Sequence, residues 1–203
     1  MTSSPPTMDP SPTTTTTTTT PGPTTPGTPG TTGKPVFFHY MIGTISDAHC
    51  KKDIQDAKAL GADAFALNIN TVTATWATTT VEYLFKYAAE QGFKLFFSFD
   101  MTGFNNPGQF IDFLKKYAGH SAHYKYNGLP FVSTFNGGQN TFGYSSVSEG
   151  WKKALQDPMA NAPTSQPIYF VPAFQDITIT SSFYSTFPTL DGLVIPFSDI
   201  RLC

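Results

Sequence analysis

The 203-residue sequence has few charged residues: Asp, Glu, Lys and Arg together make up only 13% of it, and the formal net charge is −2. This balance gives no reason to expect binding to nucleic acid or to an anionic membrane surface. No apolar run approaches the roughly 20 residues that a membrane-spanning helix needs. The two cysteines, Cys50 and Cys203, permit at most one disulfide, and no metal-ligand spacing occurs, so we expect no metal site.

The first 34 residues lack Leu, Ile, Val and aromatic side chains, and Asp9 and Lys34 are their only charged residues. Such a segment cannot bury enough apolar surface to offset the entropy of ordering it, so we expect residues 1–34 to be a disordered linker. Its Thr, Ser and Pro content is typical of an O-glycosylated stalk, and it fits a plain spacer equally well. No basic and apolar signal peptide is visible after Met1, so we expect that the true N-terminus lies upstream or that the gene model starts late.

Strand-like and helix-like patterns alternate after the linker. The strands are predicted at residues 36–41, 63–69, 93–99, 130–135 and 168–172, with a possible sixth at 193–196; the helices are predicted at 49–60, 78–91, 107–118 and, more weakly, 147–155. This alternation indicates βαβ units and a parallel sheet. No GxGxxG motif follows the first strand, which counts against a nucleotide-binding doubly wound sheet.

We therefore predict an α/β fold, a (β/α)8 TIM-type barrel of which only an incomplete N-terminal portion is present. A complete barrel of this type usually takes about 250 residues, more than follow the linker here. Residues 35–192 are assigned to the barrel, and residues 193–203 to an atypical C-terminal tail. Helix-stopping glycines, Gly61 and Gly92, stand shortly before the second and third predicted strands, as expected where a helix leads into a strand.

In a barrel of this kind, functional side chains gather at the C-terminal ends of the strands. Polar residues stand at or shortly after five such ends: His39, Asn68 and Asn70, Asp100, Asn136, and Gln175 and Asp176. Amides, an imidazole and carboxylates together suit a site that binds sugar hydroxyls. The low charge and the 15% content of aromatic residues fit the same kind of neutral ligand, although most of the aromatic side chains belong to the core.

Several of these residues have a structural alternative. His39 lies in an apolar strand, where a lone histidine is more often part of the core, and Asn136 taken singly fits a strand end that binds water. Asp100 could cap the following loop near Thr102 or Asn105. Asp63 begins its strand, so we expect it to stabilise the opposite face of the barrel.

Glycoside hydrolysis normally needs two carboxyl groups, one acting as acid and one as base or nucleophile. The glutamates, Glu82, Glu90 and Glu149, all fall in or beside helix patterns, and none stands at a strand end. Asp100 is therefore the one convincing carboxylate on the functional face, and the sequence offers it no clear partner.

Five segments, in order, resemble the sequence blocks of glycoside hydrolase family 71, the fungal α-1,3-glucanases or mutanases. They are VFFHYMIG, DIQDAKALGADAFALNI, GFKLFFSFDM, YKYNGLPFVSTFNG and FVPAF, within about residues 36–174. The resemblance implies a (β/α)8 catalytic domain that hydrolyses α-1,3-glucan with inversion, through carboxylate acid/base catalysis and without a metal or organic cofactor. It also implies a secreted or cell-wall location. By position, His39, Asn68 and Asp100 match polar family positions that face the cleft.

The sequence departs from this family in two places. Asn136 stands where members commonly carry Glu, and the Asp-x-x-Glu pair that they carry beyond the fifth strand occurs nowhere in the chain. We therefore expect a truncated glycoside hydrolase that lacks its main acid/base pair, with Asp100 in a supporting role and His39, Asn68, Asn136 and Asp176 binding the α-1,3-glucan. Two rival interpretations are a non-catalytic α-glucan-binding remnant and a non-folding product of a faulty gene model. Endo or exo action and the oligomeric state stay open.

Overall fold

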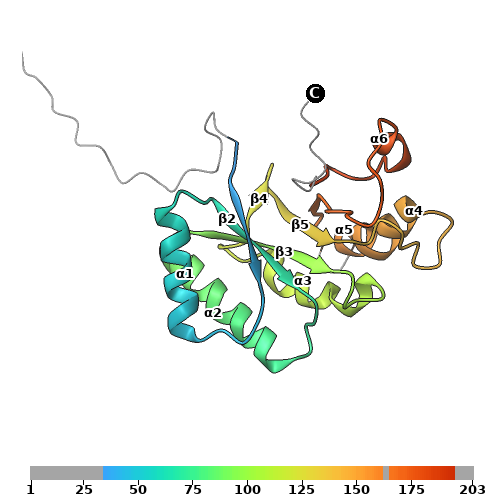
Figure 1. Cartoon of the computed structure of the whole chain (residues 1–203). Coiled ribbons are helices and arrows are strands. Elements are labelled where there is room, and N and C mark those ends of the chain that lie inside the picture. Colours follow the sequence, from blue (N-terminus) through green and yellow to red (C-terminus); the bar gives the residue numbers. More distant parts are fainter. Residues whose placement is uncertain (1–33, 162–164, 195–203) are drawn as a thin grey trace, which may run out of the picture. The chain divides into compact units, whose positions relative to one another are not determined.

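The computed structural model of the chain describes residues 34–161 and 165–194 (Figure 1). The predicted linker, apart from Lys34, lies outside the described residues, as does the predicted tail from residue 195 onward. Five strands form a parallel sheet in the order in which they occur along the chain. They are β1 (Phe37–Met41), β2 (Ala64–Ile69), β3 (Lys94–Asp100), β5 (Leu129–Phe135) and β6 (Tyr169–Phe170). The parallel α/β sheet predicted from the sequence is confirmed.

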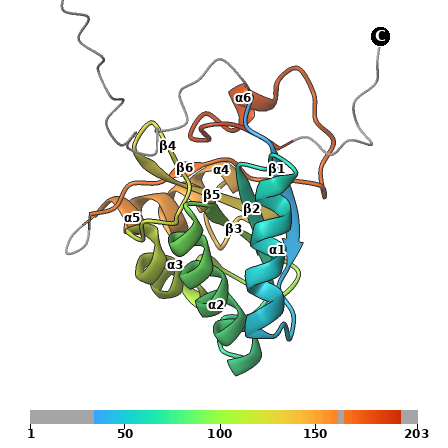
Figure 2. The ribbon, with the colours of Figure 1, turned by 90° about the vertical axis from the view of Figure 1, so that its left-hand side faces the viewer.

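Three helices cover one face of this sheet: α1 (Asp47–Ala59), α2 (Thr75–Gln91) and α3 (Ile111–Ala118). Figure 2 shows them side by side in front of the strands. Their apolar sides bury the larger core, in which Phe85, Phe97 and Tyr117 are in mutual ring contact. Among the described residues, every helix is too short or too polar to cross a membrane. The other face of the sheet is left for the candidate site.

Local signals explain where the helices begin and end. The Ser46 hydroxyl accepts a hydrogen bond from the His49 N–H and caps α1, so that the helix begins at Asp47, two residues before its predicted start. Gly61 and Gly92 have φ of 83° and 67°, the left-handed conformation that glycine adopts without steric cost. Gly92 is the C-cap of α2. Both glycine stops are confirmed.

The opposite end of the sheet is held by Asp63, as the sequence predicts. Its carboxylate accepts a hydrogen bond of 2.7 Å from the Val36 N–H, and its own N–H donates to the Val36 carbonyl. The pair joins the beginnings of β1 and β2, far from the strand ends that carry the candidate site residues.

The structure differs from the predicted elements between β3 and β5. The helix predicted at 107–118 begins as a 3-10 turn, η1 (Pro107–Gln109), and is interrupted at Phe110, whose ring stacks on Phe99 at 3.9 Å. A short strand that was not predicted, β4 (Lys125–Tyr126), pairs antiparallel with β5 across Asn127 and Gly128. Both turn residues have positive φ, as an Asn-Gly hairpin requires, so the sequence held this signal.

The chain is also less regular around β6. The helix predicted at 147–155 comprises α4 (Val147–Trp151), the π-helical turn η2 (Lys152–Gln156) and α5 (Asp157–Ala160), and a short α6 (Phe183–Thr186) was not predicted. β6 spans two residues, and the segment stays paired with β5 beyond it, because Ala173 donates to the Thr134 carbonyl at 2.9 Å. Val194 donates to the Pro172 carbonyl, but residues 193 and 194 form no strand, and the rest of the predicted sixth strand lies outside the described residues.

Candidate functional site

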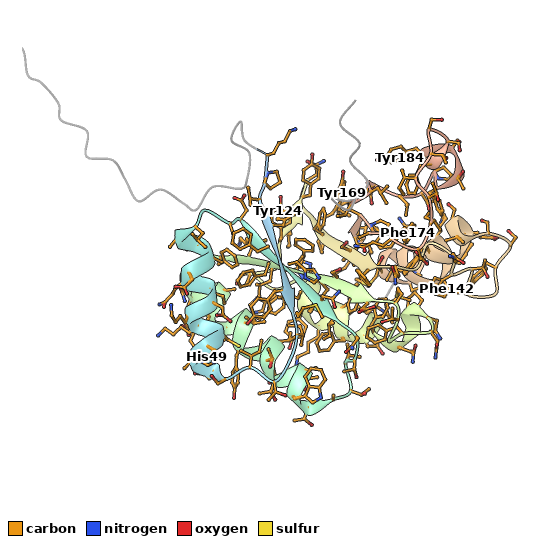
Figure 3. The ribbon with its side chains drawn as sticks, in the orientation of Figure 1. His49, Tyr124, Phe142, Tyr169, Phe174 and Tyr184 are labelled. Atoms are coloured by element: carbon orange, nitrogen blue, oxygen red, sulfur yellow. The ribbon has the colours of Figure 1, made fainter. Side chains whose placement is uncertain are left out.

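The uncovered face of the sheet is closed at the N-terminal ends of the strands by a layer of aromatic rings. It comprises Phe37, Phe96, Tyr124, Phe131 and Tyr169, whose neighbouring ring centroids lie 4.8–6.2 Å apart. Figure 3 shows Tyr124 and Tyr169 at this end of the sheet. Because alternate residues of a strand share one face, the side chains that follow along each strand lie above this layer.

A pocket of about 390 Å³ occupies the space above the aromatic layer. Its lining combines apolar side chains with an imidazole, an amide and two hydroxyls: Phe37, His39, Ala66, Phe96, Ser98, Ser133, Phe135, Ala173, Gln175 and Val194. It therefore reaches from the aromatic layer to the C-terminal ends of the strands. Flat rings beside a few polar groups form a surface that suits the apolar faces and hydroxyls of a sugar.

Two of the residues predicted at the strand ends line the pocket, Gln175 and His39. His39 is on β1, in register with Ala66 of β2, and its side chain is exposed. The alternative of a histidine enclosed in the core does not apply, because the side chain is exposed. Within the described residues the imidazole has no hydrogen-bond partner, so both ring nitrogens are available to a ligand.

Asp100 ends β3 with its side chain partly exposed, at the position that pairs with Phe135 of β5. Its Oδ1 accepts hydrogen bonds from the Thr102 N–H at 3.0 Å and from the Thr102 hydroxyl at 2.7 Å. The carboxylate therefore caps the loop after β3, which is the structural alternative foreseen for it. Its Oδ2 accepts no hydrogen bond from the described residues, which leaves one oxygen for a sugar hydroxyl or a water molecule.

The two asparagines lie near the pocket but do not line it. Asn68 is on β2, 3% exposed, and follows Ala66 on the same face, in register with Ser98 of β3. Asn136 follows β5 in a left-handed conformation with φ of 60°, and its N–H donates to the Ala173 carbonyl at 3.0 Å. Both are at strand ends on the side of the sheet where the pocket opens.

Asp176 has a different environment from the other predicted site residues. Its carboxylate oxygens accept hydrogen bonds from two backbone N–H groups of the loop after β5, Gly138 at 2.9 Å and Gly137 at 3.3 Å. Its own carbonyl accepts from the Gln139 side-chain amide at 2.6 Å. The structure thus brings Asp176 to the loop that carries Asn136, and not to the pocket lining.

The glutamates are remote from this face. Glu82 of α2 forms an exposed ion pair with Lys116 of α3 at 3.0 Å, and Glu149 caps the start of α4 through the N–H of Ser145. Glu90 is exposed near the end of α2. In the part of the chain that the structure describes, Asp100 is therefore the carboxylate best placed toward the pocket, and no group of three His, Cys, Asp or Glu side chains could hold a metal ion.

Residues 32–195 match the sequence profile of glycosyl hydrolase family 71. The chain belongs to this family. It is 39% identical over 150 residues to glucan endo-1,3-alpha-glucosidase agn1 of Schizosaccharomyces pombe. The aligned segment covers 71% of this chain and 34% of that protein. The chain is 32% identical over 148 residues to mutanase Pc12g07500 of Penicillium rubens, covering 70% and 30%. The chain thus spans about a third of the length of the curated relatives that it matches.

A solved structure shares the fold of this family 71 chain. The GH99 endo-alpha-mannosidase from Bacteroides thetaiotaomicron superposes with a TM-score of 0.59 at 15% sequence identity, over 78% of this chain and 57% of that one. A likeness at this identity concerns the fold alone.

Sequence reasoning missed two hydroxyls of the pocket in this family 71 chain. Ser98 and Ser133 are buried, pair with each other across β3 and β5, and both line the cavity. The signal was present, because each is a polar residue inside an otherwise apolar strand pattern. Assigning it required the register of the two strands, which the pattern alone does not contain.

The loop after β3, which Asp100 caps, packs against the end of β2 at Gly103. A Cβ atom at this position would lie 2.2 Å from the Asn70 carbonyl oxygen, closer than any real contact. We expect Gly103→Ala to lower the free energy of unfolding by about 1–3 kcal/mol, because the two loops must separate. Gly43→Ala is the matched control, since a Cβ there has no neighbour within 4 Å. Urea unfolding of both variants tests this, and equal stability of the two would contradict the packing described.

Proposed function

We propose that this chain is part of the catalytic barrel of an α-1,3-glucan hydrolase, and that its pocket binds the polysaccharide. The observation that carries the proposal is the pocket itself, which combines rings, hydroxyls and an imidazole at the strand ends of a family 71 chain. The relatives named glucan endo-1,3-alpha-glucosidase and mutanase supply the substrate class. A third relative is named ascus wall endo-1,3-alpha-glucanase, which supports an extracellular or cell-wall location.

The barrel itself is the first part of this proposal. In a (β/α)8 barrel each parallel strand lies beside the one before it, whereas a doubly wound sheet reverses direction in its middle. The order β1, β2, β3, β5, β6, with α1, α2 and α3 outside, matches the first arrangement. The five strands then correspond to the first five of eight, and the aromatic layer fills the lower part of the barrel interior.

Catalysis is the second part. Inverting hydrolysis needs one carboxylic acid to protonate the leaving oxygen and one carboxylate to activate water on the opposite face of the sugar. Asp100 cannot do both, and the amides beside it do not titrate. In the whole enzyme we assign Asp100 to sugar binding or water orientation, His39, Asn68 and Asn136 to contacts with sugar hydroxyls, and the acid/base pair to residues beyond those described here. No cofactor enters this scheme.

The same observation favours a second function for the chain by itself, that of a non-catalytic α-glucan-binding unit. The pocket is formed by described residues, while the described carboxylates supply no pair across it. The 203-residue chain is therefore expected to bind α-1,3-glucan without hydrolysing it. A reducing-sugar assay on insoluble α-1,3-glucan separates the two functions. Turnover that Asp100→Asn abolishes would show that a catalytic partner lies within this chain.

Retention on insoluble α-1,3-glucan tests the binding site. We expect His39→Ala to weaken retention about tenfold, because the imidazole lines the pocket and offers hydrogen bonds to sugar hydroxyls. His49→Ala is the matched control, since His49 is exposed on α1, on the helical side of the molecule (Figure 3). Equal retention of the two variants, or no retention of the unmodified chain, would exclude this pocket as the glucan site.

A further inference from the structure

The loop after β5 forms a concave group of backbone N–H donors around the carboxylate of Asp176. Asn136 and Gly137 both have positive φ, 60° and 98°, which turns the next N–H groups toward one point. Successive N–H groups in such a turn form a small anion-binding concavity. Gly138 and Gly137 donate to the two different oxygens of Asp176, at 2.9 and 3.3 Å. Both carboxylate oxygens are therefore engaged by main chain 38 and 39 residues away in sequence.

The loop after β5 packs closely against the Asp176 carboxylate on one side and against Trp151 on the other. A Cβ atom on Gly138 would lie 2.9 Å from the Asp176 Oδ1, and one on Gly137 would lie 2.7 Å from the Trp151 ring. The indole N–H of Trp151 donates to the Gly137 carbonyl at 3.0 Å, and Trp151 is fully buried. A side chain on Gly137 would clash with Trp151, and one on Gly138 would clash with Asp176, so the packing requires glycine at both positions.

This loop sets the positions of two strand-end residues. A Cβ on Gly137 would lie 3.0 Å from the Met101 side chain, which shows how closely the loop rests on Met101. Met101 directly follows Asp100, and its N–H donates to the Phe135 carbonyl at the end of β5. Asn136 directly precedes Gly137 and Gly138, whose N–H groups donate to Asp176. The carboxylate of Asp176 therefore holds Asn136 and the loop that packs beside Asp100 in one arrangement at the mouth of the pocket.

We propose that Asp176 is a positioning residue for the sugar site, which acts through the N–H groups of Gly137 and Gly138 and not by touching the glucan. The effect on glucan binding rests on the function proposed above. Each of its two oxygens already accepts a backbone hydrogen bond from this loop, and Asp176 is not part of the pocket lining. Its removal changes the conformation of the loop from which Asn136 reaches the substrate.

The affinity of the full 203-residue chain for a soluble α-1,3-linked gluco-oligosaccharide, measured by calorimetry, tests the role. Asp176→Asn and Gly138→Ala should each weaken binding about tenfold, since each breaks the charged hydrogen bonds to the loop. The double variant should bind no more weakly than the worse single variant, because both changes remove one interaction. Full affinity in Gly138→Ala together with a loss in Asp176→Asn would overturn the proposal and make Asp176 a direct sugar ligand.

Asp191→Asn is the matched control for general destabilisation. Asp191 also accepts a backbone hydrogen bond, from the Phe170 N–H at 2.7 Å, but at β6 away from the loop after β5. We expect it to lose thermal stability as Asp176→Asn does while keeping wild-type affinity. A parallel loss of affinity in Asp191→Asn would reduce the role of Asp176 to stability alone and overturn the proposal.

Amide resonances supply a readout that needs no ligand. In ¹H–¹⁵N spectra, Asp176→Asn should shift the amides of Gly137 and Gly138 more than any others outside the sequence neighbours of residue 176. Unchanged Gly137 and Gly138 amides would show that Asp176 does not hold this loop and would overturn the proposal. If the unmodified chain binds no oligosaccharide, the proposed function fails, and these two resonances alone then decide whether Asp176 positions the loop.

Discussion

Replacing Trp151 with Ala is expected to lower the free energy of unfolding by about 3–5 kcal/mol. The side chain is fully buried where η2, β6 and the loop after β5 meet, with its ring 5.1 Å from Phe170 and 4.9 Å from Phe142. Its removal leaves a large cavity and also deprives the Gly137 carbonyl of its donor. Urea unfolding followed by circular dichroism measures the loss without depending on tryptophan fluorescence.

The chain contains its own control for this experiment. Trp76, the other tryptophan, is 39% exposed on α2, so Trp76→Ala should cost far less. Trp151→Phe is the graded variant: it keeps an aromatic ring and removes the indole donor, which is expected to cost about 1–3 kcal/mol. Similar losses in Trp76→Ala and Trp151→Ala would contradict the burial described for Trp151.

Acidification from pH 6.5 to pH 4 is expected to remove about 3 kcal/mol of stability through one side chain, His123. It is 2% exposed, beside the rings of Phe85 and Phe97, and burial lowers its pKa to about 4 although its Nε2 hydrogen-bonds to the Phe131 carbonyl at 3.0 Å. The unfolded chain takes up this proton near pH 6.5, and the folded chain only near pH 4. The contribution of His123 is therefore complete above pH 6.5 and is lost as the pH falls toward 4.

The His123→Gln variant isolates this contribution. Glutamine does not titrate, and its amide can donate to the Phe131 carbonyl in place of Nε2. The free energy of unfolding, measured between pH 4 and pH 7, should fall less steeply on acidification in the variant, because its glutamine does not titrate. The carboxylates are common to both proteins, so their contribution cancels in the comparison. Parallel curves would show that His123 is not buried in its neutral form.

The strands could be predicted because each is an apolar run bounded by residues with strong local preferences. Gly61 and Gly92 stop helices before β2 and β3, and Pro130 lies near the start of β5. The shorter elements were missed for a physical reason as well. β4 exists because it pairs with β5, and the break at Phe110 exists because its ring stacks on Phe99, so tertiary contacts outweigh the local pattern.

The site was harder to predict than the fold. Its position at the end of the first predicted strand made His39 a candidate, and the structure has it in the pocket lining. The turn chemistry of Asp100 with Thr102 was foreseeable because it is local. The hydrogen bonds of the Asp176 carboxylate were not foreseeable, because their donors are 38 and 39 residues away in sequence and depend on the positive φ of Asn136. Residue type and strand position identify which side chains reach a site, but not which of them are already engaged by main chain.

The sequential order of the strands also bears on how the chain acquires its structure. β1 pairs with β2, β2 with β3 and β3 with β5, so each pairing joins neighbouring βα units and none waits for a distant segment. Pairings of this kind keep contact order low for a parallel sheet and favour faster folding. During synthesis, when the N-terminal part emerges first, α1 and α2 can pack on β1–β2–β3 before β5 leaves the ribosome. The sheet can thus grow by addition at one edge, in the direction of translation.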